Sequence, residues 1–218
     1  MATQNLLAIT GNRLSHKYFA NQLVSHFKLS AVFIEKVHYP DPFFNSDKER
    51  KAWKEFFLNR QKIEESLLRF SENDHAQNNP KIFKIEKGCL NSNKTLQLIH
   101  KFNPAKIIVF GASLLGSKYL HLYPDCILNL HVGLSQYYRG SSCNFWPIHD
   151  LKPQLLGATV HFVSKRIDGG NIVIQDTIDL DKRDSEFVLM TKPIILGPKL
   201  MIEAIKRTNT DLANKGIP

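Results

Sequence analysis

The sequence predicts an α/β fold of the Rossmann-like type, with a mostly parallel sheet and helices on both faces. Short apolar runs at residues 6–11 and 106–110 end in glycine and have the continuity of buried strands. Between the first run and a second strand-like segment at residues 29–37, apolar residues recur at helical spacing. Parallel neighbouring strands need such a crossover helix, so this β-α-β opening indicates a parallel sheet.

The next part of the chain predicts a long helix. Ser46 begins a Ser-x-x-Glu capping box, and aromatic and aliphatic residues recur at three- and four-residue steps as far as Phe70. An aromatic stripe at this spacing is usually core packing, and we expect the same here. Residues 71–80 are polar and predict a loop.

Two shorter elements follow before the sheet resumes. Residues 82–85 predict a short strand, and either Asn91 or Ser92 predicts the cap of a helix that ends near Pro104. The apolar run 106–110 then predicts a central strand with a loop at its carboxyl end.

The run Ile127-Leu128-Asn129-Leu130-His131 carries two polar side chains at the carboxyl end of an apolar strand. Successive strand residues point to opposite faces, so Asn129 and His131 share one face. In open α/β sheets the ligand crevice lies at the carboxyl ends of the strands. We therefore expect a functional site here.

The remaining segments predict a strand pair and a broken C-terminal helix. Residues 158–163 alternate like a strand, and a hairpin-like return through 167–170 leads to another at 171–175. Beyond it, Pro193 and Pro198 are expected to interrupt the helical pattern.

Composition indicates one domain over residues 1–218, with 43% hydrophobic and 22% charged residues. No apolar run is long enough to span a membrane, and we expect a cytoplasmic protein without a membrane partner. The three cysteines have no metal-binding spacing and predict free thiols. The formal charge of +9 favours anionic ligands but does not choose among them. Because the basic residues are scattered, nucleic acid is not the expected partner.

The chemistry that these residues allow is acyl transfer to a nitrogen nucleophile. A histidine can move a proton, an asparagine N–H can hold an oxyanion, and Asp168, from an Asp-Gly-Gly turn, can orient the imidazole. A purely structural His131 is an open alternative, as is a metal site formed by His131, His149, His161 and Asp168. No metal-binding motif accompanies those four residues, and we expect no metal.

Three linked blocks resemble the core of the formyltransferase family. They are the asparagine-histidine segment 129–140, the Gly-x-Thr-x-His segment 157–161 and the Asp-Gly-Gly segment 167–173. The family pattern has Ser-Leu-Leu-Pro where this chain has Gly133-Leu134-Ser135-Gln136, which puts the substrate contacts of that loop in question.

The resemblance implies a fold that binds N10-formyltetrahydrofolate and a catalytic set of Asn129, His131 and Asp168. It also implies two further groups of residues. The folate side would be formed by Phe110, Gly111, Ala112, Ser113, Leu114, Ile167 and Gly169. The acceptor side would be formed by Gly133, Tyr137, Tyr138, Arg139, Gly140 and Trp146, which offer flat rings and a phosphate-binding guanidinium.

Elimination favours a nucleotide-linked amino sugar as the amine acceptor. Relatives that act on methionyl-tRNA carry a further C-terminal barrel, which we expect this chain to lack. Purine-pathway relatives have a glycine-rich phosphate loop after the first strand, and the segment 10–15 has one glycine. Acceptors such as glycinamide ribonucleotide or methionyl-tRNA stay open, as does a catalytically inactive nucleotide- or nucleic-acid-binding relative. A homodimer also stays open.

Overall fold

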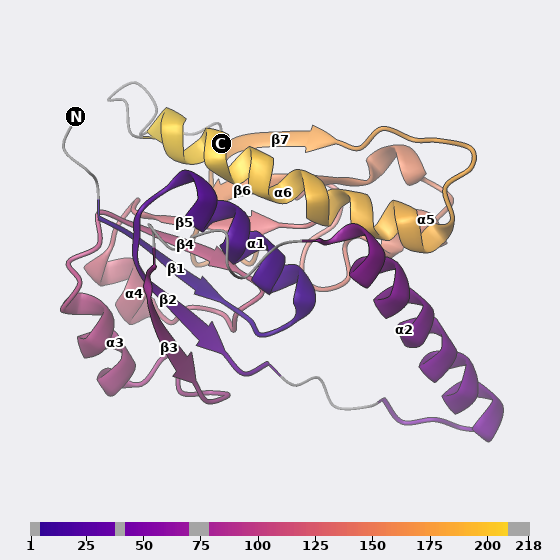
Figure 1. Cartoon of the computed structure of the whole chain (residues 1–218), viewed down its shortest axis with the longest axis horizontal. Coiled ribbons are helices and arrows are strands. Elements are labelled where there is room, and N and C mark those ends of the chain that lie inside the picture. Colours follow the sequence, from indigo (N-terminus) through magenta and orange to yellow (C-terminus); the bar gives the residue numbers. More distant parts are fainter. Residues whose placement is uncertain (1–4, 38–41, 70–78, 209–218) are drawn as a thin grey trace.

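The computed structural model describes residues 5–37, 42–69 and 79–208. Strands and helices alternate along most of this chain (Figure 1). The strands are β1 (Leu6–Thr10), β2 (Leu29–Glu35), β3 (Lys81–Ile85), β4 (Lys106–Phe110), β5 (Ile127–His131), β6 (Gly157–Phe162) and β7 (Ile172–Thr177). The helices are α1 (Leu14–His26), α2 (Asp47–Leu67), α3 (Asn93–His100), α4 (Ser117–Leu122), α5 (Trp146–His149) and α6 (Glu186–Thr208), with one 3-10 turn at Pro153–Leu155.

The seven strands form a single mixed sheet in the order β3-β2-β1-β4-β5-β6-β7. The pairs from β3 to β5 are parallel, and β6 and β7 are antiparallel additions at one edge. The predicted Rossmann-like, mostly parallel sheet is confirmed. Strand order reverses direction between β1 and β4, which is where open α/β sheets place their ligand crevice.

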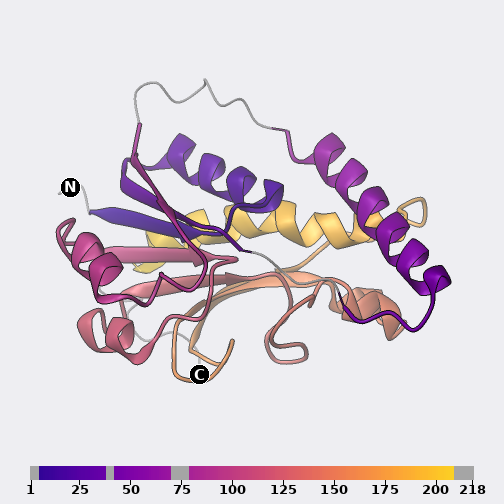
Figure 2. The same cartoon turned by 90° about the horizontal axis from the view of Figure 1, so that it is seen from below.

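Helices cover both faces of this sheet (Figures 1 and 2). On one face, α1 and α6 bury side chains such as Phe19 and Met201 against strands β1, β4, β5 and β6. On the other face, α3 and α4 pack Ile99 and Tyr119 against β1, β2, β4 and β5. The even residues of β5 lie in the first cluster, so Asn129 and His131 face the second side, where α3 and α4 lie over neighbouring strands.

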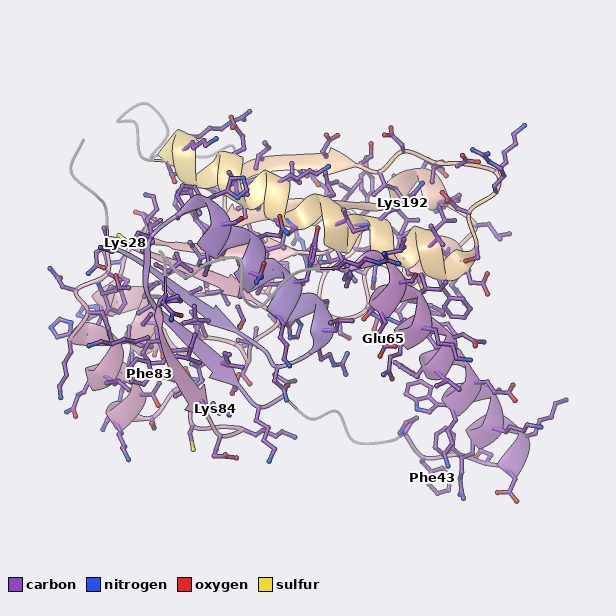
Figure 3. All side chains as sticks on the ribbon, in the orientation of Figure 1. Lys28, Phe43, Glu65, Phe83, Lys84 and Lys192 are labelled. Carbon is purple, nitrogen blue, oxygen red and sulfur yellow. The ribbon has the colours of Figure 1, made fainter. Side chains whose placement is uncertain are left out.

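Helix α2 corrects one prediction from the sequence. It begins after Ser46, whose hydroxyl accepts a hydrogen bond from the Glu49 N–H, so the predicted cap is confirmed. None of its residues is buried, however, and the expected core packing of its aromatic stripe is wrong. The end that carries Glu65 approaches the body, and Phe56 in the middle of the helix meets Phe145 and Phe187, while the end beside Phe43 projects away (Figure 3). Periodicity shows that a helix has an apolar face, but not whether another element covers it.

Helix α6 corrects a second prediction. It continues from Glu186 to Thr208 with Pro193 and Pro198 inside, so the expected break is absent. Both prolines are buried, and the helix packs on β6 and β7 as well as on α1 and α2. Each proline in a helix costs about 3 kcal/mol, and burial of a long apolar face offsets that cost.

Two further local predictions are confirmed, and a third falls mostly outside the described residues. The cap of α3 is Ser92, whose hydroxyl accepts a hydrogen bond from the Thr95 N–H, and Ser92 is one of the two alternatives predicted. All three cysteines are free, as expected. Most of the predicted loop 71–80 lies outside the described residues. Within the described part of the chain, no helix is long and apolar enough to cross a membrane.

Candidate active site

Strands β5 and β6 place three polar side chains next to one another. In their antiparallel register Asn129 lies opposite His161, and His131 lies opposite Thr159. The amide nitrogen of Asn129 is 3.2 Å from Nε2 of His161. The predicted shared face of Asn129 and His131 is therefore the face on which these cross-strand contacts form.

Asp168 joins this group from the loop between β6 and β7. Its φ of 46° lies in the left-handed region, an uncommon conformation that aspartate tolerates better than most residues. One carboxylate oxygen accepts a hydrogen bond from the Gly140 N–H at 2.8 Å and lies 3.3 Å from Nδ1 of His131. The structure thus brings the three residues of the predicted catalytic set together.

His161 also belongs to this cluster, although the sequence marked it only as a possible metal ligand and not as part of the catalytic set. It is almost fully buried, and Nδ1 lies 2.8 Å from the Phe162 carbonyl oxygen. Its Nε2 faces both the Asn129 amide and, at 3.5 Å, the other oxygen of Asp168. His161 therefore links the asparagine to the aspartate. The signal was present in the Gly-x-Thr-x-His block, two positions beyond a buried threonine.

Burial and charge act in opposite directions on His131. The ring is 6% exposed, and this burial, with the positive charge of Arg139 and the nearby His161, lowers its pKa below the ordinary value, although the Asp168 carboxylate and the Tyr138 carbonyl act to raise it. Nε2 lies 2.9 Å from that carbonyl oxygen. His131 is therefore neutral at neutral pH, although both of its nitrogens lie close to oxygen acceptors.

Asp168 is held in its ionised form. Burial alone would raise the pKa of this carboxyl group, but His161, His131 and the Gly140 N–H together hold the pKa below its ordinary value. An ionised carboxylate beside a neutral imidazole is a suitable arrangement for collecting or returning a proton.

The loop that follows β5 differs from the family pattern, and its packing gives the reason. A Cβ atom on Gly133 would lie 2.6 Å from Cβ of Cys143 and 2.7 Å from Nε2 of His131. The side chain of the buried Cys143 thus occupies the space next to this glycine. Thr159 ties the same loop down, since its hydroxyl donates to the Gly133 carbonyl and accepts from the Ser135 N–H.

The predicted acceptor-side residues are partly exposed and partly committed to the loop. Arg139 donates from Nε to the Ser135 carbonyl at 2.6 Å, so it pins the loop while the residue as a whole stays exposed. The Tyr138 hydroxyl donates to Asp150. Tyr137 is 64% exposed and Trp146 44%, so these two rings are open to a ligand.

Of the predicted folate-side residues, Phe110 ends β4 and the others lie in the loops after β4 and before β7. Phe110 is buried at the end of β4, and Gly111 has a φ of 66°. In the first loop Ser113 and Leu114 are exposed, and Ala112 is half-buried. In the second loop Ile167 is exposed, and a Cβ on Gly169 would approach Arg166.

His16 fills the crevice between the loops after β1 and β4. A Cβ on Gly11 would lie 2.2 Å from Nδ1 of this histidine, and a Cβ on Gly111 would lie 2.1 Å from Nε2. Both positions therefore require glycine. Burial, with help from Arg13 and Arg60, lowers the pKa of His16 to about 4, so the ring is neutral.

Two other features lie outside this cluster. Across residues 5–37, 42–69 and 79–208, no group of three or more His, Cys, Asp or Glu side chains is arranged to hold a metal ion. A surface cavity of about 760 Å³ lies between α3 and α4, with Leu96, His100, Lys118 and His121 in its walls. None of the predicted site residues lines it.

The fold and this cluster define an α/β protein of the Rossmann type with an asparagine-histidine-aspartate site at the carboxyl edge of its sheet. Comparison with known families agrees, since the family described as formyl transferase matches residues 59–205. The chain belongs to the formyl transferase family. This match extends well beyond the three sequence blocks, from the second half of α2 into α6.

Individual relatives are distant. The methionyl-tRNA formyltransferase of Desulforamulus reducens is 28% identical over 137 residues, which cover 62% of this chain and 43% of that protein. The enzyme of the same name from Thermotoga neapolitana is 28% identical over 127 residues, or 56% of this chain and 39% of that protein. The chain thus spans less than half the length of these curated relatives.

Solved structures support the fold. The phosphoribosylglycinamide formyltransferase of Anaplasma phagocytophilum has a TM-score of 0.64 and 14% identity, covering 95% of this chain and 87% of that chain. A formyltetrahydrofolate deformylase from Pseudomonas syringae has a TM-score of 0.65 and 12% identity, covering 95% and 62%. At these identities the likeness concerns the fold alone.

Proposed function

We propose that the protein transfers a formyl group from N10-formyltetrahydrofolate to the amine of a nucleotide-linked amino sugar. The observation that carries this proposal is the linked cluster of Asn129, His131, His161 and Asp168 at the carboxyl edge of the sheet in a member of this family. Such a cluster offers one amide donor, one neutral imidazole and one ionised carboxylate, which are the groups that acyl transfer to nitrogen requires.

Each residue has a role in the proposed reaction. The amine nitrogen attacks the formyl carbon, and the carbonyl oxygen gains the negative charge. Asn129 directs one amide N–H toward His161, which leaves its second N–H for that oxyanion. His131 and Asp168 then move the proton that the amine loses toward the folate nitrogen as the carbon–nitrogen bond to folate breaks.

The crevice beside α1 is relevant to the choice of acceptor. A phosphate at this position would need open backbone N–H groups and a cation. Arg13 and Arg60 supply positive charge near this position, but the His16 ring fills the space between Gly11 and Gly111. This arrangement disfavours a ribonucleotide phosphate beside β1, and so supports an acceptor other than glycinamide ribonucleotide.

The acceptor side offers surfaces that suit a nucleotide-linked sugar. The exposed rings of Tyr137 and Trp146 can stack on a base or sugar. The exposed Arg139 keeps its terminal guanidinium nitrogens for a phosphate while Nε holds the loop.

Methionyl-tRNA is the second candidate acceptor. The curated relatives described above are named methionyl-tRNA formyltransferases, and the formal charge of +9 suits a polyanionic partner. The two candidates differ in what they require of the protein, because only the tRNA supplies a long phosphate backbone.

A panel of acceptors tests the proposal. The protein is incubated with N10-formyltetrahydrofolate and, separately, amino-sugar nucleotides, glycinamide ribonucleotide and methionyl-tRNA, and release of tetrahydrofolate is followed. We expect turnover with an amino-sugar nucleotide. Turnover with methionyl-tRNA alone would select the second candidate, and no turnover with any acceptor would indicate an inactive relative.

Matched variants test the cluster. Asn129→Ala, His131→Ala and Asp168→Asn should each lower kcat by at least about a hundredfold. His121→Ala is the control, because His121 is an exposed histidine of α4 in the wall of a cavity that none of the predicted site residues lines. Full activity in His131→Ala would remove that residue from the mechanism.

A further inference from the structure

Glu35 is a fully buried carboxylate at the carboxyl end of β2. Strand β1 separates β2 from β4 in the sheet, so the side chain reaches past the end of β1. There it meets the loop that follows β4. None of the ion pairs among the described residues involves Glu35. Burying an unpaired carboxylate is costly unless hydrogen bonds hold it.

Both carboxylate oxygens of Glu35 are bound by a single residue. The Ser113 N–H donates to Oε2 at 2.7 Å, and the Ser113 hydroxyl donates to Oε1 at 3.0 Å. Ser113 lies in the middle of the loop between β4 and α4, which has no regular structure of its own. The carboxylate therefore holds the exposed loop from its buried side.

A second anchor holds the other half of the same loop. The Asn91 amide donates to the Leu114 carbonyl at 2.9 Å and accepts from the Gly116 N–H at 2.7 Å. Glu35 thus orients one peptide group of the loop, and Asn91 orients two others. In a trans peptide the carbonyl points opposite to the N–H of the same group. The Ala112 carbonyl consequently points away from Glu35, and the Leu115 carbonyl points away from Asn91.

We propose that Glu35 is a positioning residue for the formyl donor, because it sets the backbone of Ser113 so that the Ala112 carbonyl faces the ligand. A pterin ring carries an amino group and ring N–H groups, which need such acceptors. Glu35 does not touch the ligand, since its side chain is fully buried. This inference rests on the proposed function, in which the loop from Phe110 to Leu114 binds the folate.

Three variants separate hydrogen-bond geometry from charge and from stability. Glu35→Leu removes both bonds and should raise the donor KM about tenfold, with kcat unchanged within about twofold. Ser113→Ala removes only the hydroxyl bond and should raise KM about threefold. Glu35→Gln should stay within about twofold of the wild type, because its oxygen accepts the Ser113 N–H and its amide donates to the hydroxyl.

The control is Glu86→Leu, since Glu86 is an exposed carboxylate directly after the neighbouring strand β3. Its donor KM should not change. Binding of tetrahydrofolate is measured in parallel by calorimetry, which needs no acceptor, and melting temperatures report folding. If Glu35→Leu fails to fold, the donor KM and tetrahydrofolate affinity of Ser113→Ala and Glu35→Gln still test the role of Glu35.

The outcomes are distinguishable from failure of the proposed function. Wild-type protein that binds no tetrahydrofolate would overturn both the proposed function and the role of Glu35. Wild-type protein that binds it, with unchanged donor affinity in Glu35→Leu and Ser113→Ala, would overturn only the role of Glu35. A fall in kcat at constant donor KM, or a Glu35→Gln variant as weak as Glu35→Leu, would also overturn it.

Discussion

Gly133 shows how one residue can depart from a family pattern without opening a gap. The sequence alone marked this position as a lost serine. The structure shows that Cys143 fills the space beside the glycine and that His131 lies against it. The two residues are ten positions apart, and the sequence pattern gave no sign that they are in contact.

Gly133→Ala tests this packing. The added Cβ would meet Cys143 and His131 at distances that real atoms do not adopt, so we expect a loss of about 1–3 kcal/mol in the free energy of unfolding. Displacement of His131 should also lower kcat/KM. Denaturant titration and initial rates measure the two effects. Gly116→Ala is the control, because its nearest neighbour is an Asn91 side-chain oxygen at 3.2 Å. Equal stability of both variants would contradict the argument.

The titration of His131 depends on Asp168. The carboxylate raises the pKa of this histidine, although burial lowers it more. Asp168→Asn removes the raising contribution and leaves the burial, so the pKa of His131 should fall further below its ordinary value. An NMR titration of the histidine ring signals measures the shift.

The matched control for this titration is Asp47→Asn. Asp47 is an exposed carboxylate that pairs with Arg50 at the start of α2 and has no contact with His131 or Tyr138 among those described. It should leave the His131 pKa unchanged. A rise of that pKa in Asp168→Asn would show that the carboxylate acts on His131 in the opposite direction.

At the scale of elements, α2 is attached to the body by few side chains. Phe56 packs against Phe145 at 5.9 Å and against Phe187 at 5.3 Å between ring centroids, but it is only half-buried, and no residue of α2 is fully buried. The aromatic stripe predicted from the sequence is real, but only part of it meets another element. Whether another element covers such a stripe depends on the assembled fold and not on the helix itself.

Phe56→Ala should therefore destabilise the protein by about 2 kcal/mol, less than loss of a fully buried phenylalanine. Phe43→Ala is the matched control, because Phe43 is 91% exposed at the projecting end. It should change the free energy of unfolding by less than about 0.5 kcal/mol. Chemical denaturation compares the two variants, and a larger loss in Phe43→Ala would show that the projecting end is covered in solution.

Helix α6 also differs from what its local sequence predicts. Pro193 and Pro198 predict breaks by their local chemistry, yet the helix runs through both. Its close approach to the sheet explains why this is tolerated, since a Cβ on Gly197 would lie 2.5 Å from Leu130. Tertiary burial outweighs a local preference where the buried face is long.

At the scale of the whole molecule, the sheet order decides which loops meet. The β5 and β6 strands that carry Asn129, His131 and His161 are neighbours, and the loops from Gly140 and Asp168 meet above them. β2 and β4 are not neighbours, and only the end of β1 allows Glu35 to reach Ser113. Glu35 thereby holds a loop residue that lies 78 positions away in the sequence.

The sequence by itself determined the α/β class, the strand that carries Asn129 and His131, and the family, because periodicity and linked motifs are local or short-range patterns. The tertiary structure decided the rest. It showed which faces are covered, that His161 joins the cluster, that Cys143 stands beside Gly133, and that Glu35 holds the loop after β4. These contacts join segments far apart in the chain, and no local pattern encodes a distance in space.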